Sequence, residues 1–197
     1  MFMELIILRH GKTVGNTENR YVGRTDEPLS DKYIDEVKAQ GSDPEVSKVY
    51  VSPLIRARQT AQIFFPNAKQ TVVDGLREMD FGDFEGRTGD EMVNDEAYRK
   101  WVDGNCEGPC PNGEDLNVFR NRVCSAFKQL MLDNIKDGNE HLVIVAHGGT
   151  IMAVMSSFTE AKSPYFDWFV PNCHGWRANV ELRGPDSDII LTDSKYI

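Results

Sequence analysis

Short apolar runs alternate with segments of helical periodicity along most of the chain, and this alternation constrains the fold more than any other feature of the sequence. The runs at residues 3–8, 48–52, 70–74 and 141–146 are rich in branched side chains and are too short for buried helices, which is typical of buried strands. Strands separated by helices favour a parallel sheet that is covered on both faces. We therefore expect an α/β fold, a three-layer αβα sandwich with a mostly parallel central sheet.

Helical signals lie between these runs. Ser30 and Ser52 are suitable N-cap residues, and Pro53 suits the first position of a helix. The segment that starts at Leu116 places apolar residues at regular helical spacing. Helices are therefore expected at residues 30–40, 53–65 and 90–101, from 116 onward and from 148 onward, with a polar loop before residue 30.

The C-terminal part of the chain carries two further strand-like runs, at residues 176–184 and 188–193. The glycine and proline between them favour a tight connection. We expect an antiparallel hairpin that turns about Gly184 and Pro185.

Composition limits the possible partners of this chain. With 197 residues, of which 40% are hydrophobic, and no linker-like segment, the chain fits one globular domain, residues 1–197. No apolar run approaches the ~20 residues that span a bilayer, and the first residues lack a basic leader, so a cytoplasmic protein with no membrane partner is expected. A net charge of -9 without a Lys/Arg block argues against a nucleic-acid partner.

Arginine and histidine side chains follow three of the expected strands. Arg9 and His10 come directly after the first run, Arg56 lies in the first turn after the second, and His147 precedes a helix after the fourth. The carboxyl ends of parallel strands meet at one edge of the sheet, where α/β proteins bind their ligands. We therefore expect these four side chains to converge, although each of them alone is more typical of a structural residue.

The convergence of two arginines, two histidines and a helix N-terminus predicts a phosphate pocket. Guanidinium groups pair with phosphate oxygens in a bidentate manner, and free amides at a helix start favour an anion. A neutral imidazole that faces the phosphorus atom is a competent nucleophile. The prediction is that the arginines bind phosphate and a histidine attacks it.

Other phosphatase chemistries lack their residues in this sequence. No cysteine is followed by arginine six residues later, no aspartate nucleophile motif is present, and no clustered His/Asp set suggests a two-metal site. Cys106 and Cys110, with Cys173 and His174, do not have the spacing of a zinc site, and free thiols are expected. We expect no metal and no cofactor.

Five separated motifs resemble those of the histidine phosphatase superfamily, in its phosphoglycerate-mutase-like branch. They are LRHGKT, VYVSPLIRARQTA, LREMDFGDFEG, NGED and VIVAHGGT, and the similarity extends from Leu5 to about Val154. The resemblance implies a phosphoglycerate-mutase-like fold. It also implies that residues 80–115 form an inserted loop and helical cap over the active site.

The resemblance assigns roles to individual residues. It implies that His10 is the phosphorylated nucleophile, with Arg9, Arg56 and His147 in the phosphate pocket, while Arg58 is expected to face outward. Glu78 matches the glutamate that protonates the leaving oxygen. The remaining candidates are substrate-binding residues, namely Asn16, the backbone amide of Gly148, and Gly23.

A carboxyl group is also expected on chemical grounds, because an alkoxide leaves poorly unless it is protonated and a water must later be deprotonated. The pKa of that carboxyl must be raised, for which burial beside the phosphate is a suitable cause. The sequence alone leaves Asp80, Asp83 and Glu85 as alternatives to Glu78 for the role of proton donor. An ion pair with a nearby arginine is a purely structural alternative for Glu78.

Departures from the family pattern bear on the substrate. Gly15 stands where phosphoglycerate mutases carry a tryptophan, and residues 104–115 lack the paired arginines that hold a substrate carboxylate. The chain looks more like the small phosphatases of this branch, among them the α-ribazole phosphatases. The predicted function is hydrolysis of a small, polar phosphomonoester with a neutral or monoanionic leaving group, and α-ribazole 5′-phosphate is the named candidate substrate. A cofactor-dependent phosphoglycerate mutase and a non-catalytic phosphate-binding protein remain alternatives, and the oligomeric state is open.

Overall fold

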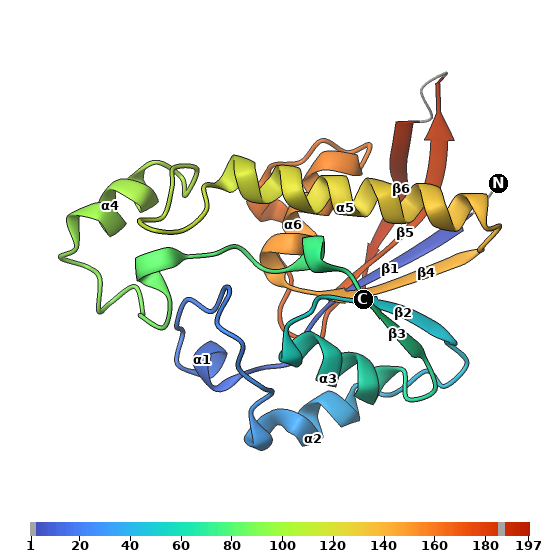
Figure 1. Ribbon diagram of the computed structural model, residues 1–197, viewed down its shortest axis with the longest axis horizontal. Helices are drawn as coiled ribbons and strands as arrows, with labels where there is room; N and C mark the ends of the chain where they lie inside the picture. The colour runs from blue at the N-terminus through green and yellow to red at the C-terminus, as the bar shows by residue number, and fades with distance from the viewer. Residues whose placement is uncertain (1–2, 185–187) are drawn as a thin grey trace.

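The computed structural model describes residues 3–184 and 188–197, which form a six-stranded sheet between two layers of helices (Figure 1). The strand order is β3-β2-β4-β1-β5-β6. Strands β1 to β4 are mutually parallel, β5 is antiparallel to β1, and β6 is antiparallel to β5, so the expected mostly parallel sheet is confirmed. The strands are β1 (Met3–Arg9), β2 (Lys48–Val51), β3 (Lys69–Val72), β4 (His141–Ala146), β5 (Gly175–Arg183) and β6 (Asp188–Tyr196).

The helices lie between the strands in the order expected for an α/β fold. The α-helices are α1 (Val14–Thr17), α2 (Asp31–Ala39), α3 (Ile55–Phe64), α4 (Glu96–Asp103), α5 (Leu116–Lys136) and α6 (Gly148–Phe158). Three short 3-10 helices are η1 (Asp74–Leu76), η2 (Gly82–Phe84) and η3 (Tyr165–Trp168).

The sheet separates two hydrophobic cores, because successive side chains of a strand point to opposite faces. Leu5 and Ile7 of β1 pack into the larger core with apolar residues of α5 and α6. Leu8, at the end of β1, and Val145 of β4 pack into the smaller core with α2 and α3. Figure 1 shows the same division, with α5 and α6 on one side of the sheet and α2 and α3 on the other. The predicted three-layer sandwich is confirmed.

The start of α3 differs from the prediction. The helix begins at Ile55, and its N-cap is Leu54, so the predicted start at Pro53 with Ser52 as the cap is wrong. The Ser52 hydroxyl lies 2.7 Å from His147 Nε2. The same hydroxyl accepts a longer hydrogen bond, of 3.4 Å, from the amide of Leu54, so the shorter contact of this side chain is with a distant strand end.

Two other helices differ from the local reading of the sequence. Helix α4 begins at Glu96 rather than at residue 90, because the Asp95 carboxylate accepts hydrogen bonds from the amides of Ala97 and Tyr98 and caps the helix there. Helix α1 overlaps the start of the predicted polar loop, at Asn16 and Thr17. Thr13 and Asn16 form a capping box that supports this single turn.

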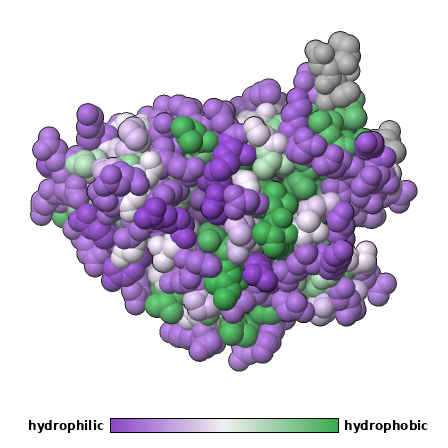
Figure 2. All heavy atoms as spheres, in the orientation of Figure 1, coloured by the Kyte–Doolittle hydropathy of each residue, from purple (hydrophilic) through white to green (hydrophobic). Residues whose placement is uncertain are grey.

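The C-terminal strands β5 and β6 pair as the predicted antiparallel hairpin. Of the predicted turn residues, Gly184 follows β5 and has a positive φ, whereas Pro185 lies outside the described residues. Hydrophilic side chains cover much of the face shown in Figure 2. Within residues 3–184 and 188–197, no helix is both long and apolar enough to cross a membrane. The four cysteines are free thiols, as expected.

Candidate active site

The side chains predicted to converge come from the carboxyl ends of neighbouring parallel strands. His10 follows β1, and His147 follows β4 and is the N-cap of α6. Because β1 and β4 pair in parallel register, Arg9 lies opposite Ala146 and the two histidines are adjacent. The centroids of the two imidazole rings are 5.1 Å apart. The predicted meeting of these strand ends is observed.

The hydrogen bonds of His10 define its tautomer. Its Nδ1 lies 2.6 Å from the carbonyl oxygen of Gly11, which only accepts, so Nδ1 carries the proton. Its Nε2 accepts a hydrogen bond of 3.2 Å from Nε of Arg56. Burial lowers the pKa of His10 well below its ordinary value, and the positive charges of Arg56 and Arg9 lower it further. The imidazole is therefore neutral, with an unprotonated Nε2.

Arg56 is fully buried and joins His10 to the loop that follows α1. Its Nη1 donates to the carbonyl of Thr25 at 2.6 Å, and its Nη2 donates to the carbonyl of Gly23 at 2.7 Å. With Nε on His10, each nitrogen of the guanidinium has a protein partner. Arg58 is exposed, as expected for the arginine that was not assigned to the pocket.

Arg9 lies against the start of α6. Its Nη1 donates to the carbonyl of Val170 at 2.8 Å, and its Cζ lies 5.4 Å from the ring centroid of Phe169. Within the described part of the chain, its buried Nε has no hydrogen-bond partner. A Cβ atom added to Gly148 would lie 3.4 Å from Arg9 Cζ, in ordinary van der Waals contact, so the guanidinium lies close to the first residue of α6.

Glu78 also lies at the start of α6. One carboxylate oxygen accepts from the amide of Gly149 at 3.0 Å, and the other accepts from the amide of Met79 at 3.0 Å. Burial raises the pKa of Glu78, although these amides and the nearby Arg56 and Arg9 oppose the shift. The carboxyl is thus positioned by amides rather than by an ion pair.

The carboxylates of the three alternative residues have other partners and do not contact the start of α6. Asp80 pairs with Arg24, and Asp83 accepts from the side-chain amide of Asn112. The Glu85 carboxylate accepts hydrogen bonds from the backbone amides of Gly23, Arg24 and Thr25 and from the Thr25 hydroxyl. Among the four candidates, Glu78 has the contact with the start of α6.

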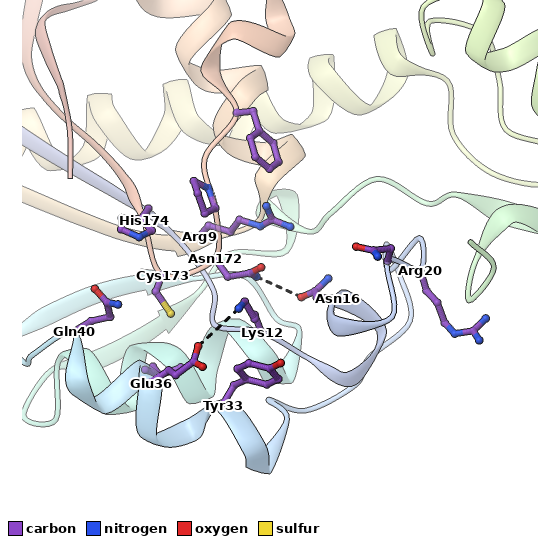
Figure 3. Close-up of a pocket in the computed structure, with 14 residues that line it drawn as sticks. Arg9, Lys12, Asn16, Arg20, Tyr33, Glu36, Gln40, Asn172, Cys173 and His174 are labelled. Atoms are coloured by element: carbon purple, nitrogen blue, oxygen red, sulfur yellow. Dashed lines mark hydrogen bonds and ion pairs between the residues drawn. The ribbon is translucent and has the colours of Figure 1, made fainter. Parts of the chain in front are cut away.

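Two polar residues of the site were missed in the sequence. The Ser52 hydroxyl lies 2.7 Å from His147 Nε2, and the buried Nδ1 of His147 has no partner in the regions that the structure describes. Asn172 donates from Nδ2 to the carbonyl of His10 at 3.0 Å and to Oδ1 of Asn16 at 3.3 Å (Figure 3). The position of Ser52 at the end of a strand was a usable signal, whereas nothing local distinguishes Asn172.

The predicted substrate-binding residues have different surroundings. Asn16 accepts a hydrogen bond at Oδ1 from the amide of Thr13 at 3.2 Å, and it lines a cleft that also contains Glu78. Gly23 donates its amide to Glu85 and offers its carbonyl to Arg56, so both of its backbone groups have protein partners. Gly148 starts α6 and lines the same cleft as Asn16. The binding roles of these three residues stay predictions.

A cleft of about 320 Å³ opens beside these residues and contains Arg9, Glu78 and Gly148. Side chains of the segment that was predicted as a cap, residues 80–115, form part of its wall, including Phe81, Trp101 and Cys106. A second, more polar pocket of about 540 Å³ adjoins this cleft (Figure 3). The two share Arg9, Asn16, Arg20 and Phe169.

No group of three or more His, Cys, Asp or Glu side chains is arranged to hold a metal ion in residues 3–184 and 188–197. The positive charge of the site comes from Arg9 and Arg56. Together with the neutral histidines and the start of α6, these groups are suited to an oxyanion with several oxygens.

A family model described as histidine phosphatase superfamily (branch 1) matches residues 5–186. The chain is 30% identical over 162 residues to 2,3-bisphosphoglycerate-dependent phosphoglycerate mutase 2 of Gloeobacter violaceus, a match that covers 77% of this chain and 73% of the mutase. It is also 30% identical over 161 residues to the adenosylcobalamin/α-ribazole phosphatase of Salmonella typhimurium, with 78% of each chain covered.

Among solved structures, phosphoserine phosphatase from Entamoeba histolytica in complex with 3-phosphoglyceric acid is similar to this chain, with a TM-score of 0.73 and 27% identity. The match covers 98% of this chain and 96% of that structure. The similarity therefore extends over the sheet and both helical layers.

Proposed function

The chain belongs to the histidine phosphatase superfamily, branch 1, and on this basis we propose that it is a phosphatase that hydrolyses a small-molecule phosphomonoester through a phosphohistidine on His10. The single observation that supports His10 most strongly is its hydrogen bonding. The Nδ1 proton is committed to Gly11, and the unprotonated Nε2 faces the guanidinium of Arg56. A neutral imidazole nitrogen beside a phosphate-binding cation is a suitable nucleophile for phosphorus.

In the first step, Nε2 of His10 forms a bond to phosphorus while the bond from phosphorus to the ester oxygen breaks. Arg9 and Arg56 stabilise the charge on the phosphoryl oxygens, and the amide of Gly148 adds a donor at the start of α6. His147 lies beside His10 and is neutral, because burial and the charge of Arg56 lower its pKa. We assign it, with Asn16, to phosphate binding.

Glu78 is proposed to donate a proton to the leaving oxygen in that step. The raised pKa of its carboxyl keeps more of the acid form available than an exposed glutamate would have. The resulting carboxylate then accepts a proton from water as that water attacks the phosphohistidine. Inorganic phosphate and the protonated Glu78 result, and His10 returns to its neutral form.

We propose α-ribazole 5′-phosphate as a substrate, which is supported by the relative named adenosylcobalamin/α-ribazole phosphatase. A mutase reaction is the second candidate, because another relative is named a phosphoglycerate mutase. A mutase must hold a second anionic group of its substrate. Arg20 in the cleft is already paired with Glu18 and Glu91, which favours the hydrolase. We further propose that the enzyme acts in the cytoplasm without a metal ion.

The test is a panel of phosphomonoesters compared by kcat/KM, with α-ribazole 5′-phosphate, 3-phosphoglycerate, phosphoserine and sugar phosphates as members. Release of inorganic phosphate is expected from the preferred ester. A parallel coupled assay contains 3-phosphoglycerate and 2,3-bisphosphoglycerate. Interconversion of the phosphoglycerates faster than phosphate release from every ester would identify a mutase instead. A chain that binds the esters without turnover would be a phosphate-binding protein.

A further inference from the structure

The motif NGED, residues 112–115, supplies no group to the proposed reaction, although each of the other four motifs supplies one. Within it, Asp115 has a local role, because its carboxylate caps α5. Glu114 instead contacts a distant segment. Its Oε2 accepts from the amide of Asp80 at 3.0 Å, and its own amide donates to the carbonyl of Asp80 at 2.9 Å. The motif therefore holds the backbone two residues after Glu78.

The backbone around Glu78 is not part of the sheet. Residues 77–80 lie outside helices and strands, so their carbonyl groups need donors from elsewhere. Arg122 of α5 supplies several of them. Its Nη1 donates to the carbonyls of Gly75 and Arg77 at 3.2 and 3.1 Å. Its Nη2 donates to the carbonyl of Glu78 at 3.3 Å. One side chain of a long helix thus holds the residues that lead to the proposed proton donor.

Glu114 fixes the orientation of the Arg122 guanidinium. Its Oε1 accepts from Nε at 3.0 Å and its Oε2 accepts from Nη2 at 2.8 Å, which is the bidentate arrangement of a strong ion pair. The two side chains are only 23% and 20% exposed, so solvent screens this pair less than a surface pair. The guanidinium also lies over the ring of Phe119, with Cζ 5.3 Å from the ring centroid. The plane of the guanidinium is therefore set from two sides.

A close approach of η1 to α5 makes these contacts possible. A Cβ atom at Gly75 would lie only 2.5 Å from Cβ of Ala126, which is one turn after Arg122 on the same face of the helix. Helix α6 holds the segment from another direction, because the Thr150 hydroxyl donates to the carbonyl of Leu76 at 3.2 Å. The segment before Glu78 is thus bound to two helices.

We propose that Arg122 and Glu114 are positioning residues for the proton donor. They hold the backbone on both sides of Glu78, so that its carboxylate accepts from the amide of Gly149 at the start of α6. Neither side chain lines the cleft that contains Glu78, so both act through the backbone rather than on the substrate. The proposal rests on the proposed phosphatase function and assigns the NGED motif a role in it.

Two esters that differ in their need for an acid test this role. Benzyl phosphate releases an alkoxide, which leaves poorly unless it is protonated, whereas p-nitrophenyl phosphate releases a nitrophenolate that leaves without a proton. In Arg122→Lys, kcat/KM for benzyl phosphate is expected to fall about tenfold or more, and kcat/KM for p-nitrophenyl phosphate about threefold at most. A general structural defect would lower both alike. Equal losses on the two esters, or no loss on either, would overturn the proposal.

Arg77→Lys is the matched control, because Arg77 directly precedes Glu78 while its exposed side chain pairs with Asp74. It is expected to keep kcat/KM for both esters within about twofold of the wild type. In the Glu78→Gln background, Arg122→Lys is expected to add less than about twofold to the loss on benzyl phosphate, since the acid is already absent. A full further loss in that background would show that Arg122 does not act through Glu78.

Glu114→Gln tests the second member of the pair with a side chain of the same shape. The carboxamide weakens the bonds to Arg122 and to the amide of Asp80, so the same selective pattern is expected, with a loss of about three- to fivefold on benzyl phosphate. A loss that does not distinguish the two esters would refute the role of Glu114. This milder variant also decides the question if Arg122→Lys does not fold.

A crystal structure of Arg122→Lys separates this proposal from the proposed function. The Glu78 carboxylate is expected to lose its contact with the amide of Gly149, and persistence of that contact at 3.0 Å would rule out the positioning role. If the carboxylate moves in the variant while the wild-type chain releases phosphate from no ester, only the proposed function fails.

Discussion

Nε of Arg56 lies 3.2 Å from Nε2 of His10, and the same guanidinium donates to two carbonyls of the loop at residues 23–25. One buried side chain therefore orients the proposed nucleophile and fixes the loop over it. The N–H groups of Arg56 that bind these carbonyls are also the groups that would bind a phosphate oxygen. A change at Arg56 therefore affects both the reaction and the stability of the loop.

His10→Ala is expected to lower kcat by about 10³-fold or more, because it removes the imidazole that is proposed to form the covalent intermediate. A quenched wild-type turnover mixture should contain phosphate on His10 that is labile to acid and stable to base, as measured by mass spectrometry. His141→Ala is the matched control, since His141 is exposed and lies at the opposite end of its strand. Wild-type turnover by His10→Ala would exclude the covalent mechanism.

Arg56→Lys is expected to reduce both stability and catalysis. Lysine cannot donate to His10, Thr25 and Gly23 together, and the buried carbonyl of Gly23, left without a donor, costs about 1–3 kcal/mol. The expected loss in the free energy of unfolding is about 2 kcal/mol, measured by urea denaturation alongside kcat/KM. Arg58→Lys changes an exposed residue of the same helix and is expected to stay within about 0.5 kcal/mol of the wild type. Equal effects of the two substitutions would refute the role of Arg56.

The pH dependence of kcat/KM should follow the ionisation of His10 and Glu78, whose pKa values are both shifted by burial. Burial lowers the pKa of His10, so its neutral form persists to lower pH than usual and is lost as the pH falls through that pKa. Burial raises the pKa of Glu78, so its acid form persists to higher pH than usual and is lost as the pH rises through that pKa. A bell-shaped profile with a mildly acidic maximum is expected.

Glu78→Gln should lower kcat for an alkyl phosphate by about 10²- to 10⁴-fold and remove the basic limb of the profile. Formation of the phosphohistidine from p-nitrophenyl phosphate should suffer less, because nitrophenolate leaves without a proton. A burst of nitrophenol, equal in amount to the enzyme, is therefore expected before slow turnover. If the basic limb survives in Glu78→Gln, a different group is the acid.

Gly149→Ala tests the close approach of α6 to Glu78. A Cβ atom at residue 149 would lie 2.3 Å from Oε1 of Glu78, so the carboxylate must move. We expect kcat to fall about tenfold or more with little change in Tm, because alanine favours the helix while the proton donor is displaced. Gly108→Ala is the control, since a Cβ there meets nothing within 4 Å. Unchanged kcat in Gly149→Ala would show that this position of the carboxyl is not needed.

Activity is expected to survive excess EDTA. Arg9 and Arg56 supply positive charge at the proposed phosphate site, and a divalent ion in the same place would be repelled. The measurement is phosphate release before and after exhaustive chelation. Loss of activity that Mg²⁺ or Zn²⁺ restores would require a different mechanism.

The sequence by itself determined the features that arise from neighbouring residues. The alternation of strands and helices indicated the α/β sandwich, because the hydrophobic period of each segment is a local property. The placement of Arg9, His10 and His147 after strands indicated one shared edge of the sheet, because the direction of each strand follows from the chain. The motifs around Arg56 and Glu78 had the spacing of a known family. The confirmed family membership and the adjacency of His10 and His147 follow from these local signals.

Only the tertiary structure decided which distant groups meet. It turned Ser52 from a predicted helix cap into a partner of His147, and it placed Asn172 on the carbonyl of His10, 162 positions away in the chain. It also placed the carboxylate of Glu78, rather than that of Asp80, Asp83 or Glu85, on the amide of Gly149, and it surrounded Trp101 with aromatic rings from separate segments. Such contacts depend on how whole elements pack, and a side chain's local pattern contains no information about which remote group will compete for it.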